Sequence, residues 1–287
     1  MITYDPKNWL RVLVEFPRSP VFRTLAIDVA LAAAWGAFVA WVELDVLRVV
    51  VPLGPAILSI LGIILGLLLV FRTNTAYDRW WEGRRLWGQL VNVSRALAHQ
   101  LDAQLPEGTE DGAAAARRGY AELLAAFPPA LAAHLRRPRP RPGAPPLPAA
   151  EHVPNLLVRD LSRRVHRDVA AGRLPREAAV ALVPLLAQFD DVTGACERIR
   201  NTPIPFSYSS YVKQFVLLYA LVLPFGLVRE FRYATALASA LVFFATMGLE
   251  LLAVEIEEPF GTDRNDLPLD DIAERVALDV RGLLGSA

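Results

Sequence analysis

The stretch VVVPLGPAILSILGIILGLLLVF, residues 49–71, decides the fold class, because it runs for 23 positions without a charged residue. A helix that crosses the hydrocarbon core of a bilayer needs roughly 20 apolar residues. Two early prolines, Pro52 and Pro55, place the start of the regular helix near Ala56. We therefore predict a transmembrane helix here. The alternative is a buried helix of a soluble protein, and the other apolar segments of the chain disfavour it.

Three further segments are apolar enough to accompany this helix. Residues 24–41 are apolar except for Asp28, and residues 214–228 and 233–249 carry no charge. The charged turn 229–232 separates the last two segments, which we expect to form a helical hairpin. The sequence thus predicts four transmembrane helices, with both chain termini on the same side of the membrane.

Charged residues beside the spans predict the orientation. Cytoplasmic loops carry an excess of Lys and Arg, and the first two spans are flanked by many basic residues. Arg229 and Arg232 in the predicted outer turn oppose this orientation but are fewer. We expect a multi-pass protein of the cell inner (plasma) membrane with cytoplasmic termini. The flanking basic residues are Lys7, Arg11, Arg18, Arg23, Arg72, Arg79, Arg84 and Arg85.

The middle of the chain predicts an aqueous helical domain, because 21% of all residues are charged although 54% are hydrophobic. Its proline-rich loop, residues 136–152, cannot form a continuous helix. This loop is either a solvated connector or a basic docking peptide. Expected helices cover residues 79–104, 112–135, 153–171 and 175–200. The predicted organisation is residues 1–72 with the first two spans, 73–213 as the cytoplasmic domain, 214–256 with the last two spans, and 257–287 as a cytoplasmic tail.

Composition and motifs argue against several classes of protein. A formal net charge of zero gives no reason to expect nucleic acid as a partner. One cysteine, Cys196, cannot build a Cys-rich metal site, and we expect no metal site at the histidines because their spacing is not that of metal ligands. The histidines are His99, His134, His152 and His166. No HExxH, GxGxxG, GxxxxGK[ST] or GxSxG motif occurs, so we expect neither an enzyme nor a cofactor. The ionisable residues within the spans, Asp28 and Glu250, are functional suspects by position, although structural pairing explains them as well.

The second span offers a face that a pore requires. Ile63, Leu67 and Phe71 follow one another at intervals of four, which places them along one side of a helix. On an adjacent side, Gly62 and Gly66 form a GxxxG pattern that allows another helix to approach closely. A ring of several copies would turn the apolar side into a narrow collar, and such collars gate by dewetting.

Three motifs carry a resemblance to a known family. FRTNTAYDRWWEGRRLWGQLVN at residues 71–92, CERIRNTPIPFSY at 196–208 and EIEEPFGTDRNDLPLD at 255–270 occur in the order found in bacterial bestrophins. The sequence resembles this channel family over nearly its whole length, except for the proline-rich loop. The resemblance implies an all-α membrane protein that assembles as a homopentamer around one central pore, with four transmembrane helices and a cytoplasmic helical domain in each subunit.

The resemblance also implies site residues. The neck of the family's pore maps to Ile63, Leu67 and Phe71, the face already found by spacing. A second constriction near the cytoplasmic exit maps to Ile204, with Thr202 as the alternative. Eukaryotic members bind calcium after the last span. Only Asp263 and Asp266 match carboxylate positions there, so we expect at most a weak calcium site and no strong calcium gating.

The sequence therefore predicts a passive channel for small monovalent ions. The resemblance to bacterial members implies a slight preference for cations, and a chloride-selective or otherwise anion-selective channel is the alternative. The expected partners are further copies of the chain, membrane lipid and the conducted ions. A non-conducting membrane scaffold or sensor is a second class of function, and a membrane enzyme using Asp28 or Glu250 is a third.

Overall fold

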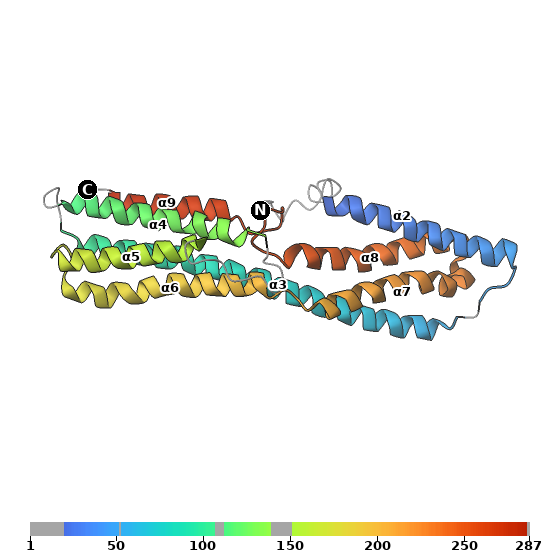
Figure 1. Ribbon diagram of the computed structural model, residues 1–287. Coiled ribbons are helices and arrows are strands. Elements are labelled where there is room, and N and C mark those ends of the chain that lie inside the picture. Colours follow the sequence, from blue (N-terminus) through green and yellow to red (C-terminus); the bar gives the residue numbers. More distant parts are fainter. Residues whose placement is uncertain (1–19, 52, 107–111, 139–150, 286–287) are drawn as a thin grey trace. The chain divides into compact units, whose positions relative to one another are not determined.

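A computed structural model describes residues 20–51, 53–106, 112–138 and 151–285, and within these ranges all regular structure is helical (Figure 1). The predicted basic residues Lys7, Arg11 and Arg18 and most of the proline-rich loop lie outside the described residues. The helices are α2 (Pro20–Trp41), η2 (Val42–Val46), α3 (Pro55–Gln104), α4 (Ala113–Leu135), α5 (Val153–Ala170), α6 (Arg176–Asn201), α7 (Phe206–Phe231), η5 (Arg232–Ala234), α8 (Thr235–Ile256) and α9 (Leu269–Gly285).

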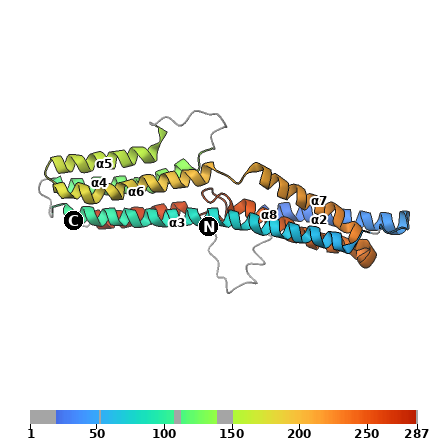
Figure 2. The same ribbon diagram turned by 90° about the horizontal axis from the view of Figure 1, so that it is seen from below.

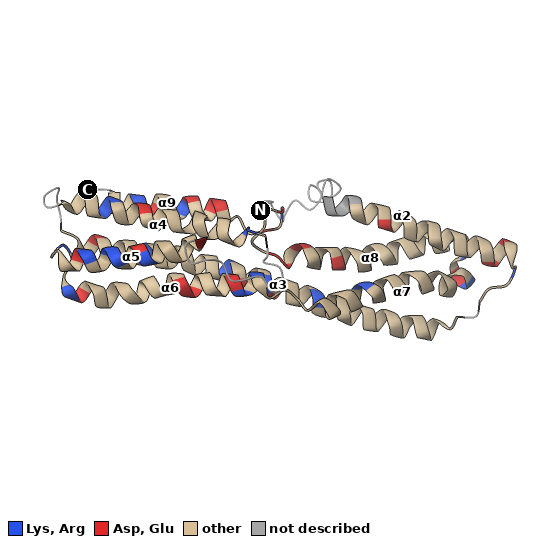
Figure 3. Cartoon of the chain, viewed as in Figure 1, with Lys and Arg blue, Asp and Glu red and all other residues tan. Residues whose placement is uncertain are grey.

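The chain folds into two compact units. The apolar unit consists of Ile2–Asp78 and Ile204–Glu257, and the polar unit of Arg79–Pro203 and Glu258–Ala287. Figure 3 shows the difference in charge: few charged residues lie on α2, α7 and α8, whereas α5, α6 and α9 carry many. The apolar unit holds the residues predicted to cross the membrane, and helix α3 contributes its first half to this unit and its second half to the other.

Four helical stretches are long and apolar enough to cross a membrane. They are Thr24–Val46, Pro55–Gln104, Arg176–Asn201 and Phe206–Ile256, with mean hydropathies of 1.9, 2.4, 1.3 and 2.0. The last stretch contains both α7 and α8, so it holds the two spans that the sequence predicts there. Helix α6 was not predicted as a span. It has the lowest hydropathy of the four, and its buried side chains belong to the core of the polar unit.

Close backbone approaches shape the apolar unit, in which α2, α7 and α8 contact one another. A Cβ on Gly36 of α2 would lie 3.1 Å from the Cα of Ala236 in α8, so a larger residue would push the two helices slightly apart. A Cβ on Gly62 would lie 2.9 Å from the hydroxyl of Tyr219, so the first glycine of the predicted GxxxG pattern makes room for the tip of a tyrosine side chain. Gly66 has no such neighbour within 4 Å in the single chain.

The predicted hairpin is present. Helix α7 ends at Phe231, a single 3₁₀ turn follows, and α8 begins at Thr235. Arg232 has a φ of 50°, a left-handed conformation that reverses the chain at this turn. The charged turn predicted between the two apolar segments is therefore a true chain reversal, and it places α7 beside α8.

The polar unit is a bundle around one apolar core, in which α4 packs against α5, α6 and α9 (Figure 2). Trp87 of α3 and Tyr120 of α4 are fully buried, and Phe127 meets Phe189 of α6 edge-on with ring centroids 4.8 Å apart. Helix α9 lies in the segment predicted only as a tail, and it contributes one continuous apolar side to this core. Its buried residues are Leu269, Ala273, Val276, Val280 and Leu284.

Candidate functional site: an exposed face of helix α3 and a buried ion network

The three residues predicted to form the neck lie on a side of α3 that the chain's own helices leave uncovered. Ile63, Leu67 and Phe71 are 71%, 56% and 56% exposed. At about 100° per residue, Leu65 and Leu69 point to the opposite side of the helix. Both are buried, in a cluster with side chains of α7. Helix α3 is therefore packed on one side and apolar but open on the other.

The open side of α3 becomes polar immediately beyond the predicted neck. Asn74 and Asp78 are exposed, and at about 100° per residue each lies within about 20° of the direction of Leu67. The same stripe thus runs from Ile63 to a carboxylate at Asp78 without crossing a packed surface. The sequence-based prediction of this helix face ended at Phe71 because the chain becomes polar at Arg72. Asn74 and Asp78 nevertheless continue the face at helical spacing.

Arg72 follows the neck directly and points into the protein, where it is only 1% exposed. Its Nη2 donates to Glu257 Oε2 over 2.7 Å, and its Nε lies 3.5 Å from Glu250 Oε2. The other oxygen of Glu257, Oε1, accepts the backbone N–H of Ile204 over 3.1 Å. The Glu257 carboxylate therefore contacts both Arg72, directly after the predicted neck, and the backbone of Ile204, just before α7.

The structural explanation for Glu250 is confirmed, because this fully buried carboxylate pairs with Arg72. Asp28 is half-buried in α2. The sequence analysis did not identify Glu43 as a buried carboxylate. Glu43 is buried in the π-helical turn that follows α2, and its Oε1 accepts the N–H of Val51 over 3.4 Å. A carboxylate within an apolar stretch is the sequence signal for such residues, but the partner is not readable from the local sequence.

The two residues predicted for the second constriction differ in their surroundings. Ile204 is buried in the apolar unit, with 8% of its surface exposed. Thr202 is exposed at the end of α6 in the polar unit. Its carbonyl accepts from Arg79 Nη1 over 2.5 Å, while Arg79 Nη2 donates to the carbonyl of Ile199 over 2.6 Å. The arginine of the RWW motif thus stabilises the carboxyl end of α6, where unpaired carbonyls attract a cation.

The two aspartates predicted for a weak calcium site lie in one turn. Asp266 is buried, and its Oδ2 accepts the backbone N–H of Asp263 over 2.7 Å. A Cβ on Gly261 would lie 2.5 Å from this oxygen, so the turn requires glycine there. Asp263 is exposed. One carboxylate therefore holds the backbone, and a calcium ion would have to compete with that hydrogen bond.

These features define an all-helical membrane protein with an open apolar face on one long helix. Comparison with known proteins identifies its family, because the family model for bacterial and fungal bestrophin proteins matches residues 1–282. The chain belongs to the bestrophin family, which is a family of ion channels.

Relatives and solved structures agree with this assignment. The voltage-dependent anion channel-forming protein RSc3414 of Ralstonia nicotianae is 36% identical over 294 residues, covering 99% of this chain and 95% of the relative. Protein sll1024 of Synechocystis, which carries the same descriptive name, is 33% identical over 289 residues, covering 98% and 93%. The crystal structure of a bacterial bestrophin homologue from Klebsiella pneumoniae matches with a TM-score of 0.78 at 28% identity, covering 91% of this chain and 99% of that one.

Proposed function

We propose that the chain is one subunit of a homopentameric channel that passively conducts small monovalent ions through an apolar neck of Ile63, Leu67 and Phe71. The observation that carries the proposal is the open side of α3, opposite the side that packs against α7. A subunit with four spans is too small to enclose a pore, so the pore requires a ring of copies. Membership of an ion-channel family supports using the open side for conduction rather than for lipid contact.

In the proposed assembly the first two spans (residues 1–72) and the last two (214–256) lie in the inner membrane. The helical domain of residues 73–213, the tail of residues 257–287 and both termini face the cytoplasm. The excess of basic residues beside the first two spans supports this orientation. The exposure of Thr202, compared with the burial of Ile204, favours Thr202 as the side chain that lines the second constriction.

Two observations point to different ion selectivities. Asp78 lies on the line of the neck residues, and five copies would form a ring of carboxylates, which favours cations. The relatives' names describe anion channels, which favours anions. We propose a preference for cations, set by Asp78, with anion selectivity as the alternative. Reversal potentials in an asymmetric salt gradient separate the two, because a shift toward the chloride equilibrium potential would overturn the cation assignment.

The test of conduction is planar-bilayer recording of the purified chain with ion substitution. Phe71→Ala widens the proposed neck and should raise ion flux, whereas Leu31→Ala, a matched truncation at an exposed position of α2, should leave flux unchanged. Equal flux in wild type and Phe71→Ala, with both proteins folded, would remove Phe71 from the neck. Absence of any flux would favour a scaffold or sensor. Adding calcium should change the current little, because the turn at Asp263 offers few free carboxylate oxygens.

A further inference from the structure

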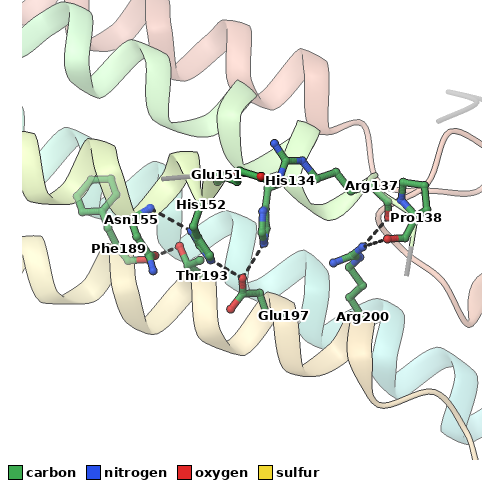
Figure 4. Close-up of polar contacts among 10 residues, drawn as sticks. All are labelled: His134, Arg137, Pro138, Glu151, His152, Asn155, Phe189, Thr193, Glu197 and Arg200. Carbon is green, nitrogen blue, oxygen red and sulfur yellow. Dashed lines mark hydrogen bonds and ion pairs between the residues drawn. The ribbon is translucent and has the colours of Figure 1, made fainter. Parts of the chain in front are cut away.

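A cluster of two histidines and a glutamate joins three helices of the polar unit (Figure 4). His134 lies in the last turn of α4, His152 caps the amino end of α5, and Glu197 lies on α6. The Nε2 atoms of His134 and His152 lie 2.6 Å and 2.7 Å from the same oxygen, Glu197 Oε1. The centroids of the two rings are 4.4 Å apart, so both imidazoles converge on one point.

Hydrogen bonding alone leaves part of this cluster unexplained. His134 is only 3% exposed, and its Nδ1 has no hydrogen-bond partner among the described residues. Two imidazoles that contact the same carboxylate oxygen nevertheless bring three potential metal ligands together, two of them nitrogens. This arrangement leaves open what the cluster binds.

The donor set fits a divalent transition-metal ion. Zinc binds imidazole nitrogen at about 2.0–2.1 Å and carboxylate oxygen at about 2.0–2.2 Å, in tetrahedral geometry. Neighbouring ligand atoms around such an ion are about 3.3 Å apart. The three ligand atoms here already lie within 4.8 Å of one another. Opening the two short contacts by less than about 1 Å would therefore admit the ion.

The three donor atoms, two imidazole nitrogens and one carboxylate oxygen, also argue against calcium and magnesium. Calcium and magnesium prefer six or more oxygen ligands, whereas two imidazoles and one carboxylate suit zinc and its neighbours in the first transition row. An open pocket lined by Asn155, Asp190, Thr193 and Glu197 reaches the cluster. Glu197 is the member of the cluster that lines this pocket, so solvent in the pocket contacts the carboxylate side of the cluster.

We propose that His134, His152 and Glu197 form a three-ligand zinc-class site that fastens α4, α5 and α6 together. His134 lies two residues before the proline-rich loop of residues 136–152, and His152 is the last residue of that loop, so the ion would connect the two ends of the loop. His152 Nδ1 accepts the N–H of Asn155 over 3.3 Å, which leaves the ring proton on Nε2. Binding at Nε2 moves this proton to Nδ1, so the ion replaces the weak cap contact at the start of α5.

The test uses the untagged full chain in detergent, stripped of metal by a chelator and titrated with Co²⁺ as a spectroscopic probe. We expect one tetrahedral Co²⁺ per chain, with visible absorption bands that Zn²⁺ displaces. Glu197→Gln and His152→Asn should weaken binding about 100-fold or more, since each removes one of three ligands. His166→Asn is the matched control, because His166 is exposed and its Nδ1 contacts the Ser162 carbonyl of its own helix, away from the cluster.

Thermal unfolding distinguishes a folded variant that has lost metal binding from a variant that fails to fold. Zn²⁺ should raise the unfolding midpoint of wild type and of His166→Asn in a concentration-dependent manner, and it should not shift that of folded Glu197→Gln. Tetrahedral bands that are absent from wild type, or equally strong in Glu197→Gln, would overturn the proposal. These readouts do not depend on ion flux, so they remain valid whether or not the chain conducts.

Discussion

Replacing Arg72 by methionine should destabilise the apolar unit strongly. Arg72 and Glu250 are 1% and 0% exposed, so the substitution leaves a fully buried carboxylate without its cation. Removing one partner of a buried ion pair costs about 3–5 kcal/mol, because the remaining charge is uncompensated. Glu257 also loses its 2.7 Å contact but keeps the N–H of Ile204. We expect the free energy of unfolding to fall by about 3–5 kcal/mol.

A second substitution tests the reasoning. Adding Glu250→Leu to Arg72→Met removes the uncompensated carboxylate, and apolar replacement of a buried pair is often nearly neutral. The double variant should therefore recover about 2–3 kcal/mol of the loss. The matched control is Arg95→Met, because Arg95 pairs with Asp279 over 2.6 Å while both side chains are substantially exposed. That substitution should cost less than about 1 kcal/mol.

The assay is unfolding by SDS titration in mixed micelles, followed by tryptophan fluorescence and compared at equal protein concentration. Two results would refute the reasoning. If Arg72→Met is as stable as Arg95→Met, the buried network contributes little. If the double variant is no more stable than Arg72→Met, the loss comes from packing rather than from the buried charge.

The remaining predictions concern other parts of the chain. Gly226→Ala should cost about 1–3 kcal/mol by overpacking, because the new Cβ would lie 1.9 Å from Leu58 Cδ1; an unchanged unfolding midpoint contradicts this. Asp168→Asn should cost about 1.5–3 kcal/mol in the same titration, because the buried carboxylate accepts from Arg173 over 2.6 Å. Burial raises the pKa of the Cys196 thiol to about 12, so a thiol reagent at pH 8 should label it only after unfolding, and rapid labelling of the folded protein would show that the thiol is accessible.

Much of the fold was readable from the sequence because bilayer thickness and helical periodicity act locally. The charge-free run at residues 49–71 predicts a span, and the structure has α3 beginning at Pro55. The sequence reading ended that span at Phe71 and began a new helix near Arg79. The intervening residues contain neither proline nor glycine, so the helix continues unbroken while its surroundings change.

The candidate site also has one part that the sequence predicts and another part that depends on the tertiary fold. Intervals of four place Ile63, Leu67 and Phe71 on one side of a helix, and this follows from geometry alone. The partners of Arg72 do not follow, because Glu257 is 185 positions away and only the tertiary fold brings the two together. The apolar side of α9 was a missed local signal, since Leu269, Ala273 and Val276 repeat at helical intervals.

The position of α9 in the chain has a consequence for biosynthesis. This helix completes the core around α4, yet it follows both α7 and α8 in the sequence. The ribosome therefore makes residues 79–203 long before the helix that covers them, and the hairpin must be synthesised in between. During that interval the bundle exposes apolar surface to the surrounding water, and such surface attracts chaperones or aggregates. A nascent chain halted before Leu269 should bind a chaperone, and a chain released after Gly285 should not.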